Sequence, residues 1–281
     1  MKGLGLAFLG VVFSGVILWL GTSFVPAHTI AYWRFEDAKV GQDSIDKAVD
    51  SSANQFDLTQ SSEVNRPNGS SEVPVKAIPN PDKAQRTEKT TTKPSSANTR
   101  SAEFVPGQAL HKGDFLTAGK QAKLDFDEGK AFTIEGWIFP QSYAEDSSCT
   151  RYVVFKRDRT YAGYGVALGS DGLLEFRVAA DKEDQAASRS PDPVPLKTWT
   201  HFAAVRETDG TVRLYLNGKL VRTGASQLAK SLKNEGEFIV GDHGLVASPK
   251  FVFDGRIDEI RVSDVALKPE QFLNAEKQTA K

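Results

Sequence analysis

The sequence predicts an all-β fold, a two-sheet antiparallel jelly-roll sandwich. Apolar and polar residues alternate on both sides of Asn217-Gly218, and this dipeptide tolerates the positive φ angles of a tight β-hairpin turn. Short alternating segments also recur along residues 132–178 and 199–262, separated by turn sequences such as Ser170-Asp171-Gly172. A sandwich of this kind often exceeds 200 residues as one unit, so we expect a single domain over residues 28–275.

Residues 1–27 precede this domain and are predicted to be a signal peptide or a membrane anchor. The run 4–20 is almost wholly apolar and follows Lys2, which predicts an N-terminal apolar helix. Val25 and Ala27 have the spacing that a signal peptidase accepts, but the run is also just long enough to cross a bilayer. With either outcome we expect export, to the periplasm or the extracellular space, or as a protein anchored in the membrane by residues 4–20.

Within the domain, residues 61–100 are predicted to form a flexible insertion. The stretch is rich in proline, serine, threonine and mixed charge and has no hydrophobic periodicity, so it buries too little apolar surface to offset its chain entropy. The alternative is a ligand-binding or glycosylated lid, because Asn68-Gly69-Ser70 is an acceptor sequence for N-glycosylation.

The rest of the domain is predicted to consist of strands, and alternation places them at residues 132–139, 151–156, 163–168 and 173–178. Trp137 and Trp199 lie within alternating patterns, and we expect both in the core. A short C-terminal helix is expected after these strands. Pro269 suits its first position, Glu270 its positive end, and Phe272 and Leu273 its buried side.

Composition argues against several classes of partner and site. The formal net charge of −1 gives no electrostatic footprint for a polyanion, so nucleic acid is not an expected partner. Cys149 is the sole cysteine, which excludes a disulfide within the chain and a cysteine-based metal cluster.

Several segments together resemble the LamG-like jellyroll, in the concanavalin A-like lectin/glucanase superfamily. They are residues 199–206 (WTHFAAVR), 212–221, 253–262 and 132–138, together with the opening Tyr32-Trp33-Arg34-Phe35. The resemblance implies that the first strand pairs late, with the C-terminal strand. It also implies a Ca²⁺ ion held by Asp50 and Asp258, although Ala53 stands where the family commonly has glycine. The competing interpretation is that Asp50 makes an Asx turn and Asp258 caps or pairs on the surface.

Catalysis is not expected. Glycoside hydrolysis needs two carboxylates across the scissile bond, and the glucanase relatives carry theirs at alternate positions of one strand. Here Glu135 stands alone, and Asp258 and Glu259 are neighbours, which on a regular strand point to opposite faces. A glycoside hydrolase is therefore the less favoured alternative.

A binding role remains, and the loop at residues 156–164 is its best candidate. Tyr161 offers an aromatic platform, and Arg157, Asp158 and Tyr164 offer polar groups or a second ring beside it. We therefore expect an exported, non-catalytic binding module for carbohydrate or for a cell-envelope or extracellular protein. A purely structural envelope domain is the alternative.

Overall fold

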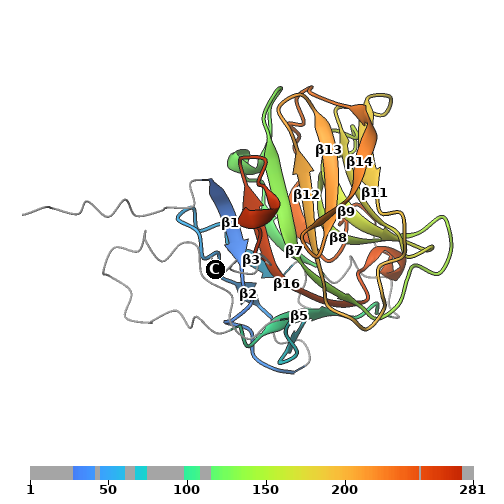
Figure 1. Ribbon diagram of the computed structural model, residues 1–281. Helices are drawn as coiled ribbons and strands as arrows, with labels where there is room; N and C mark the ends of the chain where they lie inside the picture. Colours follow the sequence, from blue (N-terminus) through green and yellow to red (C-terminus); the bar gives the residue numbers. More distant parts are fainter. Residues whose placement is uncertain are drawn as a thin grey trace, which may run out of the picture.

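Two antiparallel sheets stack face to face and form the sandwich (Figure 1). The computed structural model describes residues 28–41, 45–60, 67–74, 98–107, 115–246 and 248–273. The first sheet has the strand order β14-β13-β12-β7-β16-β5-β4, and β1 also pairs with β16. Its strands are β1 (Thr29–Trp33), β4 (Asn68–Ser70), β5 (Ser101–Phe104), β7 (Phe132–Pro140), β12 (Thr200–Arg206), β13 (Thr211–Leu216), β14 (Lys219–Gln227) and β16 (Gly255–Ser263).

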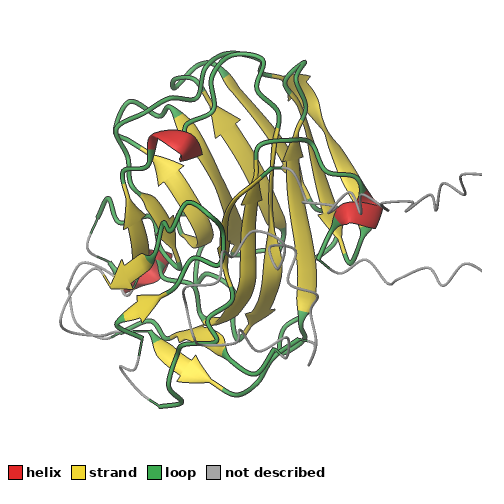
Figure 2. Cartoon of the chain, turned by 90° about the vertical axis from the view of Figure 1, so that its left-hand side faces the viewer, coloured by secondary structure: helices red, strands yellow, loops and turns green. Residues whose placement is uncertain are grey.

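The second sheet has the order β11-β10-β9-β8-β15-β6-β3-β2. Its strands are β2 (Lys47–Ala48), β3 (Leu58–Gln60), β6 (Leu116–Gly119), β8 (Thr150–Arg157), β9 (Gly163–Gly169), β10 (Leu174–Ala179), β11 (Gln185–Arg189) and β15 (Phe238–Val240). Short 3₁₀ turns, η1 (Ala122–Leu124), η2 (Pro249–Phe251) and η3 (Pro269–Gln271), lie outside the sheets (Figure 2). The expected all-β antiparallel sandwich is confirmed.

The core lies between the sheets and is built by alternation along the strands. Phe132, Ile134 and Ile138 of β7 point inward from the first sheet, and every second residue of β9 points inward from the second. The rings of Phe126 and Phe132 stack with centroids 4.1 Å apart. Fully burying one such side chain stabilises the fold by roughly 1.5–3 kcal/mol.

The same alternation corrects the expectation for the two tryptophans. Because Ile138 and Phe202 occupy inward positions, Trp137 and Trp199 face outward from the first sheet, where both are half-buried. Each packs edge-on or tilted against a neighbouring ring, at 5.3 Å from His201 and 5.5 Å from Phe139 respectively. The core assignment for these two residues is wrong.

The first and last strands of the sandwich pair with each other, as the resemblance implied. Thr29 lies opposite Ser263 and Trp33 opposite Ile260, and the Asp264 amide donates to the carbonyl of His28 at 2.9 Å. The predicted hairpin is also present. Asn217 and Gly218 have φ angles of +48° and +75°, as a primed turn requires, and they join β13 to β14.

Strand β14 at the edge of the first sheet lies beside β11 at the edge of the second, so the sandwich is closed along this side (Figure 1). The Ser188 hydroxyl donates to the carbonyl of Arg222 at 3.0 Å. A Cβ on Gly224 would lie 2.5 Å from the carbonyl oxygen of Ala187, so the close approach requires glycine. The sequence did not predict β11, because its residues are polar or small.

Two of the remaining expectations are modified by the structure. The C-terminal helix is the single 3₁₀ turn η3, after which Phe272 is buried and Leu273 half-buried. Within the expected insertion, Asn68-Gly69-Ser70 is strand β4 and pairs with β5, and residues 98–100 also contact the sandwich. Residues 61–66 and 75–97 and the N-terminal apolar helix lie outside the described residues. Along the ranges that the structure does describe, no helix is long and apolar enough to cross a membrane.

Candidate ligand-binding groove

The outer face of the second sheet carries a groove of about 170 Å³ across β8, β9 and β10. Its floor is β9, where the outward positions Gly165 and Ala167 have little or no side chain. The flanking strands carry long side chains, so they form walls on both sides of this floor. The lining residues are Thr150, Tyr152, Phe155, Arg157, Gly165, Ala167, Glu175 and Arg177.

Strand register arranges these residues in rows across the groove. Phe155, Gly165 and Arg177 lie opposite one another in one row, and Tyr152, Ala167 and Glu175 in the next. A β-bulge between Tyr152 and Val154 shifts the phase of β8, and both Tyr152 and Phe155 line the groove as a result. The groove therefore has an aromatic wall on β8 and a charged wall on β10.

The aromatic wall is supported from behind. The rings of Tyr152 and Phe155 meet edge-on at 5.0 Å, and His243 packs 5.2 Å from Tyr152 and 5.8 Å from Phe155. Burial raises the pKa of Tyr152 above its ordinary value, so its hydroxyl stays protonated even in mildly alkaline solution.

The charged groups lie on β10, across the floor from the aromatic residues, and at the end of β8. Arg157 Nε donates to the carbonyl of Tyr161 at 3.1 Å, and its guanidinium lies 5.3 Å from the centre of the Tyr161 ring. On the opposite wall, Arg177 Nε donates to Glu175 Oε1 at 2.7 Å and Nη1 to Gln185 Oε1 at 3.1 Å. Partial burial lowers the pKa of Arg157, while the bond to Glu175 raises that of Arg177.

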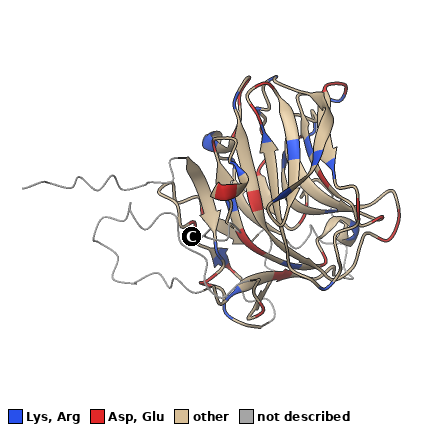
Figure 3. Ribbon diagram, viewed as in Figure 1, with Lys and Arg blue, Asp and Glu red and all other residues tan. Residues whose placement is uncertain are grey.

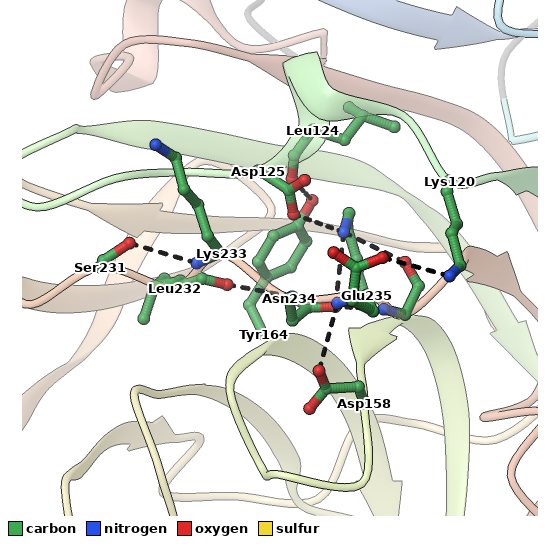
Figure 4. Close-up of polar contacts among 12 residues, drawn as sticks. Lys120, Leu124, Asp125, Asp158, Tyr164, Ser231, Leu232, Lys233, Asn234 and Glu235 are labelled. Carbon is green, nitrogen blue, oxygen red and sulfur yellow. Dashed lines mark hydrogen bonds and ion pairs between the residues drawn. The ribbon is translucent and has the colours of Figure 1, made fainter.

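The structure brings two of the four predicted ligand-binding residues together. Arg157 lines the groove and Tyr161, 46% exposed, stands beside it. Asp158 instead holds the loop, because its Oδ1 accepts from the Thr160 amide and its Oδ2 from the Glu235 amide at 3.2 Å (Figure 4). Burial alone would raise the pKa of Asp158, but the bonds from the Thr160 hydroxyl and from the Glu235 and Thr160 amides outweigh it and lower that pKa.

The structure corrects the prediction that Tyr164 belongs to the binding site. Its side chain is fully buried, and its hydroxyl donates to the carbonyl of Leu124 at 2.8 Å (Figure 4). The loop between β8 and β9 ends before Gly163, so Tyr164 is the second residue of β9 and alternation along this strand points it into the core. Tyr152, Phe155, Glu175 and Arg177 were not predicted as lining residues. Small residues at alternate positions of β9, from Gly163 to Gly169, are the sequence signal that marks the groove.

The contacts of Asp50 support an Asx turn. Its Oδ1 accepts from the amides of Tyr32 at 2.9 Å and Ser52 at 2.8 Å, and its Oδ2 accepts from the Ser52 hydroxyl and the Phe56 amide. Hydrogen-bond donors therefore surround both oxygens. Among the described residues there is no group of three or more acidic, histidine or cysteine side chains arranged to hold a metal ion.

Asp258 and Glu259 do not point to opposite faces as expected. A β-bulge falls between Asp258 and Arg261, and Glu259 adopts a φ of +53°. As a result the Glu259 carboxylate accepts from Tyr32 and Arg34, while Asp258 accepts from Asn98 Nδ2 at 2.8 Å. Burial and the nearby Glu259 carboxylate raise the pKa of Asp258. Both side chains are fully buried, so Asp258 is not the surface residue that the sequence suggested.

Glu135 is likewise buried and bound within the protein. It accepts from Arg261 Nε at 2.8 Å and from the Leu273 amide at 2.7 Å, and His201 Nε2 lies 3.0 Å from it. Burial would raise the pKa of Glu135, but the positive charge of Arg261 and the contact with His201 outweigh it and lower that pKa. The arrangement fixes the C-terminal turn against the first sheet.

Calcium binding through Asp50 and Asp258 stays a prediction. If both residues hold the ion, millimolar calcium raises the melting temperature of the wild-type chain through native-state binding, and Asp258→Ala removes that rise. A melting curve that calcium does not move contradicts the site and leaves Asp50 as a turn residue.

The family model described as Laminin_G_3, concanavalin A-like lectin/glucanases superfamily, matches residues 111–272. The chain belongs to this superfamily. The match includes β6 to β16 and therefore the whole groove. No curated protein matches the chain in sequence.

Solved structures share the superfamily fold at low identity. The binding domain of Paraclostridial Mosquitocidal Protein 1 is 14% identical with a TM-score of 0.57, over 88% of this chain and 51% of that one. Domain 4 of AbnA, an extracellular arabinanase from Geobacillus stearothermophilus in complex with arabinotriose, is 17% identical with a TM-score of 0.52, over 89% and 99%. The botulinum neurotoxin serotype D ligand-binding domain in complex with N-acetylneuraminic acid is 11% identical with a TM-score of 0.53, over 86% and 49%.

The alignments differ in how much of each solved structure they cover. The chain spans about half the length of the two toxin domains and nearly all of the arabinanase domain. At these identities the likeness shows the fold alone.

Proposed function

We propose that the chain is an exported, non-catalytic binding module and that a glycan binds in the groove across β8, β9 and β10. The observation that carries this proposal is a groove whose floor carries only glycine and alanine, beside an aromatic wall and charged groups. A sugar ring stacks on aromatic side chains, and polar groups hydrogen-bond its hydroxyls. The aromatic and charged residues of the groove therefore suit a sugar. The complexes of the two similar domains with arabinotriose and N-acetylneuraminic acid support a carbohydrate partner.

The proposal that the module is non-catalytic rests on where its carboxylates lie. Glu135, Asp258 and Glu259 are fully buried on the first sheet, each bonded to neighbouring residues, and none lines the groove. Glu175 is the sole carboxylate among the lining residues, whereas glycoside hydrolysis uses a pair. The groove therefore provides recognition without the two acids that this chemistry needs.

The test is a glycan array with the full chain and two groove variants. Ala167→Leu fills the floor, and we expect it to weaken binding about tenfold or more, because the sugar ring and the added methyl groups compete for one space. Tyr161→Ala removes an exposed ring next to Arg157. We expect a loss of roughly twofold to tenfold, the range that one aromatic contact of about 0.5–1.5 kcal/mol accounts for.

Matched controls come from the edge of the other sheet. Ala225→Leu and Leu220→Ala change exposed positions of β14 and should leave binding unchanged. Melting temperatures of all four variants show whether each remains folded. If Ala167→Leu binds as the wild type does, the site lies elsewhere, and if no glycan binds to the full chain, the proposal fails.

A further inference from the structure

The charged residues of the groove leave one positive charge without a partner. Arg157 and Arg177 are basic and Glu175 is acidic. Glu175 is already engaged, with Oε1 bonded to Arg177 and Oε2 4.0 Å from Arg189 Nε. Arg157 makes no ion pair with any carboxylate in the described part of the chain; it contacts the Tyr161 carbonyl and ring instead. The lining thus has a net charge of +1, whereas acidic and basic residues are interspersed along the ribbon as a whole (Figure 3).

Strand register places the two arginines on opposite sides of the floor. Arg157 lies opposite Gly163 and Arg177 opposite Gly165, so they sit diagonally across β9, one same-face step and two strand spacings apart. This geometry separates their Cα atoms by about 12 Å. The two glycines between them carry no side chain, so both guanidinium groups can reach the same region above the floor.

An anion above the floor would relieve a repulsion that the free protein retains. Burial lowers the pKa of Arg157, and the positive charge of Arg177 lowers it further. The two guanidinium groups therefore repel each other across the groove. Guanidinium groups bind carboxylates through paired N–H donors, and such bonds are stronger than those between neutral groups. A neutral sugar would leave this positive potential uncompensated.

We infer that the groove selects sugars that carry a carboxylate, held between Arg157 and Arg177 while the sugar ring packs against Tyr152 and Phe155. The inference rests on the proposed function, since it names the class of glycan that the same groove takes. A hexuronate or a sialic acid has the required chemistry, with an anionic group on one side of the ring and apolar C–H faces on the other.

The experiment compares matched pairs of ligands on the full chain. Oligogalacturonate, oligomannuronate and sialyllactose are each titrated beside the form in which the carboxylate has been reduced to an alcohol. For at least one pair we expect the acidic form to bind about tenfold more tightly, the effect of one or two charge-assisted hydrogen bonds. Because the groove is open to solvent, that preference should shrink as salt rises from 50 mM to 500 mM.

Variants separate this inference from the proposed function. Arg177→Gln and Arg157→Gln should each bring the acidic form close to the affinity of the reduced form, while the exposed control Arg222→Gln retains the preference. Equal binding of acidic and reduced forms, or binding of neutral glycans alone, overturns the acidic preference and leaves glycan binding intact. Absence of binding to every acidic and neutral glycan overturns both.

Discussion

Replacing Arg206 by alanine is expected to lower the free energy of unfolding by about 3–5 kcal/mol. Arg206 is fully buried at the end of β12, and its guanidinium bonds backbone carbonyls of two loops instead of a carboxylate. It donates to Leu228 at 2.8 and 3.0 Å, to Lys230 at 2.7 Å and to Lys130 at 3.0 Å. Without it, the buried Leu228 carbonyl and the partly buried carbonyls of Lys130 and Lys230 lose this donor at the same time. A carbonyl left unpaired in the interior costs about 1–3 kcal/mol, and one that water can reach costs less.

Equilibrium denaturation in urea measures this loss, and two variants calibrate it. Arg206→Lys keeps the charge but has three donors on one nitrogen, so it cannot bond both loops, and we expect it to lose about half as much. Arg213→Ala removes an arginine of the adjacent strand whose ion pair with Glu207 is about one-third exposed, and should cost less than about 1 kcal/mol. A loss below that level in Arg206→Ala would show that water replaces the lost donors.

Two neighbouring residues, Asp242 and His243, are expected to give opposite and nearly cancelling contributions to stability as the pH changes. Burial raises the pKa of Asp242 to about 7 and lowers that of His243 to about 4. Between about pH 4 and 6.5 the folded chain therefore holds a proton on Asp242 and none on His243, whereas the unfolded chain holds the reverse. Folding moves a proton from one residue to the other, so the number bound does not change.

Single variants should reveal each contribution. The folded state keeps the Asp242 proton up to a higher pH than the unfolded state, so Asp242 stabilises the protein at low pH and that stability is lost as pH rises through 7. Asp242→Asn removes this effect, and its stability relative to wild type should rise by on the order of 3 kcal/mol from pH 4 to pH 7.

His243 acts in the opposite sense, since its neutral form favours the folded state above pH 6.5 and that stability is lost as pH falls through 4. Relative to wild type, His243→Gln should therefore lose on the order of 3 kcal/mol from pH 4 to pH 6.5. Urea denaturation at several pH values, analysed as the difference from wild type, gives both slopes. Parallel slopes in the two variants would contradict the pKa shifts.

The architecture could be predicted because alternation is a local signal. Strands β7 to β10 and the hairpin at Asn217-Gly218 lie where the apolar pattern placed them, and the family match over residues 111–272 confirms the resemblance. Strands β4 and β11 escaped prediction because polar or small residues at a sheet edge need no apolar alternation. Strand β4 pairs with β5 across residues 71–100, whereas β11 pairs with β10, the strand directly before it.

Only part of the groove could be predicted, because strand pairing brings together lining residues that are far apart in the sequence. Arg157 and Tyr161 are close in sequence and were identified together, but Arg177 and Glu175 join them only through pairing of β10 with β9. The bulge in β8 that places both Tyr152 and Phe155 in the lining has no signature in the sequence, nor does the bulge that turns Glu259 toward Tyr32 and Arg34. Tyr164 was misplaced because it was counted with the 156–164 loop, although it is the second residue of β9 and alternation along that strand points it into the core.

Because β1 pairs with β16, the first strand must wait for its partner while the ribosome synthesises the rest of the chain. Tyr32 and its partner Glu259 are 227 positions apart, which at 5–20 residues per second corresponds to about 10–45 s of synthesis. During this interval the apolar side of β1, with Ala31 and Trp33, has no strand to pair with, and neither does one edge of β7. Until its last strand emerges, the nascent chain therefore exposes an aggregation-prone strand to which a chaperone can bind.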